Sequence, residues 1–198
     1  MRNQALSLPI LTFDERALSP RFGYVFHRRL LAPYESIVGM LWKFARLNRL
    51  PGQVVAMQLC RHPVDPYEGI EPAEVDVPLV ARLLGIPQRS VRTGIGNAHP
   101  DVSPCLRCCP RCLTRGYHGV LHQLERHARC PIHHSPLRTA CPHCGRLSHY
   151  RLDAQLLDAP FRCRHCRRYA TSSNIAPFLQ RPALALMDRV DLTRAVLG

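Results

Sequence analysis

The sequence predicts a mainly α-helical protein with small zinc-binding modules. A helical N-terminal domain with a helix-turn-helix-like pair is followed by two tandem zinc fingers of the zinc-ribbon or treble-clef kind. Nine of the ten cysteines fall between residues 105 and 166, and apolar residues recur at helical spacing before them. With 46% hydrophobic residues, the chain of 198 residues can bury one or two cores. We expect a helical domain over residues 1–100, a zinc region over 105–170 and a helical tail over 171–198.

Residues 34–49 form the clearest predicted helix. Pro33 precedes this segment, and proline is favoured in the first turn of a helix. Pro51 and Gly52 end the helix, and residues 53–60 continue as a second short helix. We expect the aromatic side chains of the first helix in the core. Its apolar residues at helical spacing are Ile37, Met40, Leu41, Phe44 and Leu47, with Trp42 beside them.

Residues 77–95 fit a pair of helices joined by a turn at Gly85. In this arrangement Val91 points inward, whereas Arg89 and Arg92 point outward, as on a DNA-recognition helix. Many helical hairpins that never meet DNA share the pattern. The proline-rich, acidic residues 61–78 are typical of a surface loop, and residues 94–104 of a linker.

Four short cysteine and histidine pairs lie in the zinc region, each with two residues between its members. This spacing lets one tight turn point both side chains at a single ion, and a tetrahedral zinc site needs two such turns. Seventeen residues separate the first two pairs and eighteen the last two, both in the range of zinc sites. Sequential pairing predicts two sites, although an interleaved pairing stays open. Their ligands are Cys109, Cys112, Cys130 and His133 in the first, and Cys141, Cys144, Cys163 and Cys166 in the second.

The remaining cysteines and histidines of this region are secondary candidates. Cys105 and Cys108 form a further pair, which we interpret as spare thiols. Three histidines beside the pairs could replace a ligand, but we expect exposed side chains or hydrogen bonds around the ligands; they are His134, His143 and His165. A zinc ion with four protein ligands leaves no position for a substrate, so two structural Zn²⁺ ions argue against an enzyme and a small-molecule substrate.

The chain is strongly basic. Its formal net charge is +13, and Lys43 is the sole lysine among 27 basic residues. Thiolate ligands would lower the charge to about +10. Arginine pairs bidentately with phosphate, which favours nucleic acid, although a GC-rich genome or an acidic protein partner would also account for the composition. We expect nucleic-acid contacts from Arg89, Arg92, Arg164, Arg167 and Arg168.

Other function classes lack their motifs. No run of about 18 apolar residues predicts a membrane span, and the N-terminal residues do not form a signal peptide. We therefore expect a cytoplasmic protein, in which paired cysteines bind metal more often than they form disulfides. No phosphate-binding loop of the Gly-x-x-x-x-Gly-Lys-Ser/Thr type is present in the sequence, so we expect no ATPase activity of its own.

The order of the motifs resembles the TniQ family of transposition proteins. It runs Cys109-Pro-Arg-Cys112-Leu, Gly116-Tyr117, Cys130-Pro-Ile-His133 and Cys141-Pro-His-Cys144, and the likeness covers roughly residues 8–168. The resemblance implies a bacterial target-selection adaptor that binds DNA or a targeting complex and recruits an AAA+ ATPase of the TnsC type. A transposase complex or a CRISPR effector is a further implied partner.

The sequence departs from that family in two ways. His122 stands where relatives often have tryptophan, so packing between the first two pairs differs. The chain also adds only a short tail after the second site, like the short forms of the family. An alternative function is a helix-turn-helix and zinc-finger transcription regulator. We expect the tail to form a closing helix that packs back on the protein, with apolar residues Leu184, Leu186, Met187, Val190 and Leu192.

Overall fold

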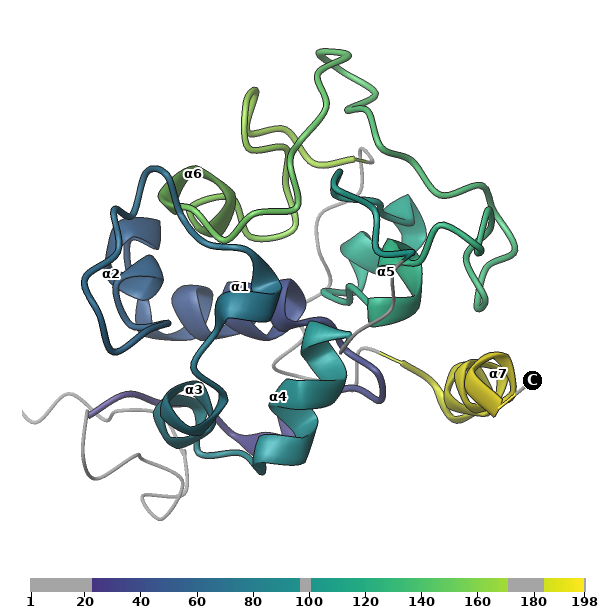
Figure 1. Cartoon of the computed structure of the whole chain (residues 1–198). Coiled ribbons are helices and arrows are strands. Elements are labelled where there is room, and N and C mark those ends of the chain that lie inside the picture. The colour runs from purple at the N-terminus through teal and green to yellow at the C-terminus, as the bar shows by residue number, and fades with distance from the viewer. Residues whose placement is uncertain (1–22, 97–100, 171–183, 198) are drawn as a thin grey trace, which may run out of the picture.

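The computed structural model describes residues 23–96, 101–170 and 184–197 (Figure 1). This part of the chain is mainly helical, as predicted, and contains isolated β-bridges but no β-strand. The zinc-ribbon or treble-clef assignment therefore stays an expectation. The α-helices are α1 (Ile37–Asn48), α2 (Gly52–Ala56), α3 (Val77–Leu84), α4 (Gln88–Ile95), α5 (Pro110–Thr114), α6 (Ala154–Leu157) and α7 (Leu186–Leu197), and short 3-10 helices lie at Arg28–Leu30, Pro72–Glu74 and Val120–Gln123.

Helix α1 is the centre of the main core. It begins later than Pro33 predicts, because the Ser36 hydroxyl accepts a hydrogen bond from the Gly39 N–H and caps the helix. Arg49 ends the helix in a left-handed conformation. Trp42 and Phe44 are fully buried, which confirms that these aromatic side chains belong to the core. The Trp42 indole donates to the carbonyl of Leu156, 2.8 Å away, and so ties α1 to α6.

The main core joins the N-terminal half to the cysteine-rich half. Helices α1 and α2 pack against α6, and α2 approaches α6 so closely that a Cβ on Gly52 would meet the Ala154 carbonyl oxygen at 2.2 Å. An isolated bridge pairs Ile70 with Leu152 across the two halves. One hydrophobic cluster thus continues from residue 26 to residue 161.

Helices α3 and α4 occupy the segment predicted to form a helical pair. Asp76 caps α3, Gly85 ends it in a left-handed conformation, and Val91 of α4 is fully buried. Helix α4 packs on both α3 and α1, and a Cβ on Gly94 of α4 would meet Met40 at 2.7 Å. Figure 1 shows α3 end-on and α4 along its length. Within the predicted surface loop, Ile70 and Val75 are buried.

A second, smaller hydrophobic cluster surrounds the first group of cysteines. Leu184, just before α7, and Leu192 of α7 pack against it, and Asp188 pairs with Arg115 at 2.8 Å. The closing helix therefore packs back as predicted, but with only part of its apolar face. Leu186 and Met187 remain 76% and 65% exposed.

A buried ion pair joins the middle of α1 to the segment that precedes the helix. Lys43 lies 2.6 Å from Glu35, both side chains are fully buried, and Lys43 also donates to the Leu30 carbonyl. Burial raises the pKa of Glu35, while the charge of Lys43 and its hydrogen bond oppose this shift. The only lysine of the chain is thus an interior residue and takes no part in the basic surface.

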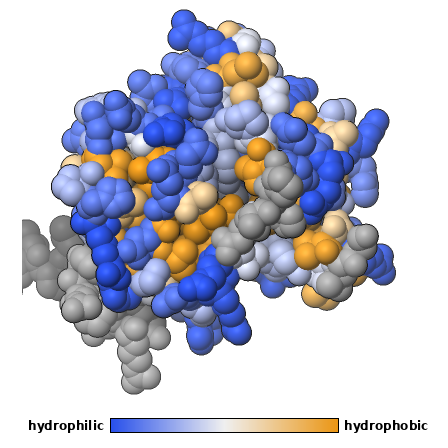
Figure 2. All heavy atoms as spheres, viewed as in Figure 1, coloured by the Kyte–Doolittle hydropathy of each residue, from blue (hydrophilic) through white to orange (hydrophobic). Residues whose placement is uncertain are grey.

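The outer surface is mostly hydrophilic. Figure 2 shows polar side chains over most of the face in view, with hydrophobic residues between them near α1. No helix in the described ranges has the length and apolar character needed to cross a membrane.

Candidate metal centres

The structure brings together four side chains of the first predicted site. The Nδ1 atom of His133 lies 3.4 Å from Cys109 Sγ, 3.2 Å from Cys112 Sγ and 3.7 Å from Cys130 Sγ. The Cys112 and Cys130 sulfurs are 3.6 Å apart. These four ligand atoms all lie within 4.8 Å of one another, and the three cysteines are fully buried.

The second predicted set also forms one group. Cys141 Sγ lies 3.7 Å from Cys166 Sγ, and Cys144 Sγ lies 3.7 Å from Cys163 Sγ. All four sulfurs are within 4.8 Å of one another. This cluster is shallower than the first, because Cys144 is exposed and the other three cysteines are half-buried. The ligands thus group in chain order, without interleaving.

Each group of four ligand atoms fits one metal ion. Bonds of about 2.3 Å to sulfur and 2.0 Å to nitrogen place tetrahedral ligands roughly 3.5–3.8 Å apart. The observed separations of 3.2–3.7 Å fall at or just below that range. A disulfide needs sulfurs about 2.05 Å apart, and all the described cysteines are free thiols. The two clusters could therefore hold two metal ions, one each.

Three of the four ligand pairs sit in the same kind of short hairpin. An isolated bridge closes each hairpin on either side of its pair: Arg129 with Pro136, Ala140 with Leu147, and Arg162 with Tyr169. Inside each, a backbone N–H points at the first cysteine sulfur 3.4 Å away, donated by His133, His143 or His165. Such donors stabilise thiolate ligands. Cys109 and Cys112 differ, because they stand at the start of α5.

A buried histidine supports the first cluster, and sequence reasoning missed this role. His122 accepts a hydrogen bond at Nδ1 from the Gly119 N–H, so its proton resides on Nε2. This Nε2 lies 3.6 Å from Cys130 Sγ and can donate to the thiolate. His122 also packs edge-on against Tyr117 and His118. Only its position between two ligand pairs hinted at this contact.

Two histidines clasp the second cluster from outside. His143 Nε2 lies 2.8 Å from the Tyr169 carbonyl, and His165 Nε2 lies 2.8 Å from the Leu147 carbonyl. Each histidine thus bonds the hairpin that carries the opposite ligand pair. They are not ligands, which agrees with the interpretation that they form hydrogen bonds around the site. His134 is exposed and likewise lies outside both groups.

Thiol pKa values reflect crowding within each group. Hydrogen bonds with Cys112 and Cys130 lower the pKa of Cys109, whereas hydrogen bonds with Cys109 and Cys130 raise the pKa of Cys112. At the second cluster, burial opposes ionisation of Cys141, but the His143 and Cys144 N–H groups prevail and lower its pKa to about 7. One thiol in each group therefore ionises readily. A bound divalent cation would favour the thiolate form of all the cysteine ligands.

The spare pair of cysteines lies outside both groups. Burial raises the pKa of Cys108 to about 12, so its thiol stays protonated. Cys105 forms a bridge with His149, and Cys108 one with Arg138. Cys108 exchanges two backbone hydrogen bonds with Arg138, whereas the neighbours of Cys105 make the bonds at its bridge, in keeping with the interpretation of both as spare thiols.

The arginines predicted to meet nucleic acid fall into different places. Arg89 and Arg92 are exposed on α4, in the lower half of Figure 1, and the segment around residue 165 lies in the upper half. Arg167 and Arg168 are exposed there. Arg164 is not free, because it pairs with Asp153 at 2.7 Å and its side chain is only 10% exposed.

Comparisons with known proteins assign no family. No protein-family model matches the chain, and no curated protein matches it significantly. The resemblance to TniQ proteins therefore depends on the order of the motifs alone. What the structure adds is that these motifs form two four-ligand clusters able to hold metal ions, joined to one helical core.

Proposed function

We propose that this protein is a non-enzymatic adaptor of DNA transposition, stabilised by two zinc ions. In this role it contacts target DNA or a targeting complex and recruits an AAA+ ATPase of the TnsC type. The observation that carries the proposal is the motif order shared with TniQ proteins, whose cysteines and histidine lie in two groups of four. A transposase complex or a CRISPR effector is a further proposed partner.

Zinc is the proposed metal because of the ligand set. Sets of four thiolates, or three thiolates and one imidazole, in tetrahedral arrangement are typical of structural zinc. Each group uses all four positions, so a bound ion would have no open position for water or substrate. The ions would stabilise the hairpins and α5, and the chain's own residues would make the contacts with partners. This supports a binding protein over a metalloenzyme.

The arrangement suits an adaptor for a mechanical reason. The second cluster is connected through residues 152–161 to α1 and α2, and the first is connected through His118 to the start of α1. Both metal modules are thus fixed relative to the helices. A rigid surface loses little conformational freedom when it binds a partner, which favours affinity.

The test is recruitment of a purified AAA+ ATPase of the TnsC type. The zinc-loaded protein is immobilised and incubated with the ATPase and ATP, and retained ATPase is quantified. We expect retention that disappears after a strong chelator and returns when Zn²⁺ is restored. Wild-type protein with two equivalents of zinc that retains no ATPase would refute the adaptor role.

A transcription regulator is the second candidate, favoured by the adjacent helices α3 and α4 with Arg89 and Arg92 exposed. However, grooves on both sides of Thr93 are lined by α4 together with Thr193 or Val196 of α7, which narrows access to α4. A regulator requires tight, sequence-selective binding by the isolated protein. Mobility shifts with selected DNA sequences test this, and binding that is indifferent to sequence would exclude it.

A further inference from the structure

Several arginines of the chain hydrogen-bond or form ion pairs with other residues of the protein. Arg107 donates to the carbonyls of Leu124 and His127, and Arg151 donates to those of Glu68 and Gly69. Others pair with carboxylates: Arg61, Arg115, Arg126, Arg164 and Arg194. Net charge alone therefore overstates the basic surface, and the unpaired arginines must be located individually.

Five arginines without a carboxylate partner in the described residues surround two adjoining hollows. One hollow lies between the end of α1 and the second metal module, has a volume of about 350 Å³ and is lined by Arg46, Arg49 and Arg162. The other is lined by Arg138, Arg162 and Arg168. Arg162 borders both. We call this set the arginine surface; its members are Arg46, Arg49, Arg138, Arg162 and Arg168.

One donor of the arginine surface is unsatisfied. The Nε atom of Arg162 is buried, with no hydrogen-bond partner among the described residues. Its guanidinium lies 5.6 Å from the centre of the Tyr169 ring, which holds it beside the first hollow. Asp158 is the only carboxylate that lines either hollow, and one of its oxygens accepts from the Gly52 N–H. Positive charge is therefore in excess, and an anion is the complementary ligand.

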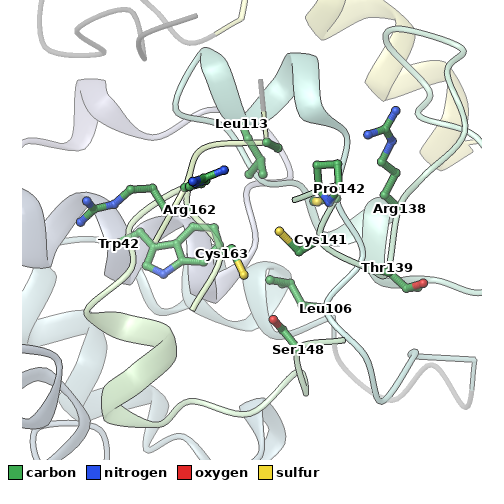
Figure 3. A pocket seen from close by; sticks show the side chains of 14 residues that line it. Trp42, Leu106, Leu113, Arg138, Thr139, Cys141, Pro142, Ser148, Arg162 and Cys163 are labelled. Atoms are coloured by element: carbon green, nitrogen blue, oxygen red, sulfur yellow. The ribbon is translucent and has the colours of Figure 1, made fainter. Parts of the chain in front are cut away.

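The second hollow is too small to accept the ring of a nucleobase. Its volume is only about 40 Å³, enough for water but not for a nucleobase. Figure 3 shows it between Arg162 and Arg138, with Trp42, Leu106 and Leu113 among its lining residues. The ligand must therefore remain on the surface and meet guanidinium groups along its length. A chain of phosphates fits this requirement better than a single nucleotide.

The two hollows also offer little exposed aromatic surface on which a base could stack. Proteins that hold single strands stack bases on exposed aromatic side chains. Tyr169 is the only aromatic residue lining the first hollow; it is half-buried, and Arg162 lies over its ring. Trp42 is fully buried. These features favour a duplex, whose bases are already stacked and whose backbone is exposed.

We propose that the arginine surface binds the phosphodiester backbone of a nucleic-acid duplex, independently of base sequence. The inference deepens the DNA contact of the proposed function and places it on the end of α1 and the second metal module, away from α4. Binding of this kind positions a duplex without selecting its sequence. ATPase recruitment is measured separately, so failure of this inference and failure of the adaptor role are distinguishable.

The test measures the affinity of the zinc-loaded protein for short fluorescent DNA and RNA duplexes of arbitrary sequence across a KCl series. The test variant is R46Q/R49Q/R162Q. Each arginine that meets one phosphate contributes about 0.9 to the slope of log affinity against log salt, which is roughly eightfold at about 0.1 M salt. We expect the triple variant to lower the slope by up to about 2.7 and the affinity by up to roughly 500-fold.

The matched control is R82Q/R89Q/R92Q, which removes the same charge from exposed residues of α3 and α4. We expect it to bind within about threefold of wild type, since it loses only long-range attraction. A second test variant, R138Q/R168Q, changes the surface without altering α1. Wild-type melting temperature and two equivalents of zinc verify the fold of each variant.

The outcomes separate the alternatives. Strong loss in both test variants, with a near-wild-type control, supports the proposal, and the DNA and RNA arms identify the duplex. Equal losses in test and control variants would mean nonspecific attraction, and a larger loss in the control would assign binding to α4. Either result, or no binding of either duplex by wild type, overturns the proposal.

Discussion

Replacing one ligand in each metal cluster should affect folding unequally, because the clusters differ in burial. Cys112 is fully buried within the second hydrophobic cluster, whereas Cys144 is exposed at the surface. The matched substitutions are Cys112→Ala and Cys144→Ala. Both remove one of four ligands, so each should reduce bound zinc from two equivalents to one.

The magnitudes follow from what each cluster supports. Zinc contributes roughly 10–16 kcal/mol at structural sites in small domains, which matches or exceeds the total stability of about 5–15 kcal/mol of a whole domain. Three ligands of the first metal site are also part of the smaller hydrophobic cluster. Cys112→Ala should therefore unfold the region around that cluster. Near the second metal site, Leu152 and Phe161 are buried in the main core, which does not depend on that ion. Cys144→Ala should therefore reduce stability by only about 0.5–3 kcal/mol.

The assay combines zinc content by mass spectrometry with urea unfolding followed by the fluorescence of Trp42, the only tryptophan. Its ring lies 6.0 Å from that of His118, next to the first metal module, and 5.1 Å from that of Phe161 in the main core. We expect a cooperative transition near the wild-type midpoint for Cys144→Ala and a much lower or broadened one for Cys112→Ala. The reverse order, or equal midpoints, would refute the reasoning.

Three further predictions concern buried charges and backbone strain. Burial lowers the pKa of His118 to about 4, so as the pH falls the unfolded chain binds a proton before the folded protein does. The free energy of unfolding should therefore decrease between about pH 6.5 and 4. In urea titrations, His118→Gln should make that decrease shallower by about 1.4 kcal/mol per pH unit. Lys43→Met leaves Glu35 buried without its ion-pair partner and should lower the free energy of unfolding by about 3–5 kcal/mol. Adding Glu35→Gln should restore part of this stability, as measured by melting curves. Arg167 has a φ of 61° in the hairpin of Cys163, at the position that Gly145 holds with a φ of 69° in the hairpin of Cys141. In thermal melts, Arg167→Gly should therefore raise the free energy of unfolding by about 1 kcal/mol, and Gly145→Ala should lower it by about the same amount.

The metal clusters were predictable because their information is local. Two residues between ligands fix a turn within one hairpin, and the separations of 17 and 18 residues allow neighbouring turns to meet. The helical pair α3 and α4 was predictable for the same reason, since Asp76 and Gly85 mark its boundaries within a few residues of the apolar pattern. Neither prediction needed long-range contacts.

Features that depend on distant contacts escaped prediction. Helix α1 begins at Ile37 because Ser36 caps it and also bonds His118, 82 residues away at 2.6 Å. The role of His122 depends on a cysteine that the fold brings near its ring. Arg164 resembled a phosphate ligand in the sequence, yet the fold places it against Asp153. Spacing reports none of these pairings, since each joins residues of different segments.

The arginines at the end of α1 have two roles that a stability measurement can separate. Arg46 lies in the last turn and Arg49 caps the helix, where positive charge is favoured by the negative end of the helix dipole. Each should therefore contribute about 0.3–1 kcal/mol to the folded protein without any ligand, and salt should weaken that contribution. A bound phosphate chain would compete with the helix end for the same guanidinium groups. Stabilisation of the protein by a duplex should then follow the measured dissociation constant of the complex and grow with duplex concentration, as binding to the folded state requires.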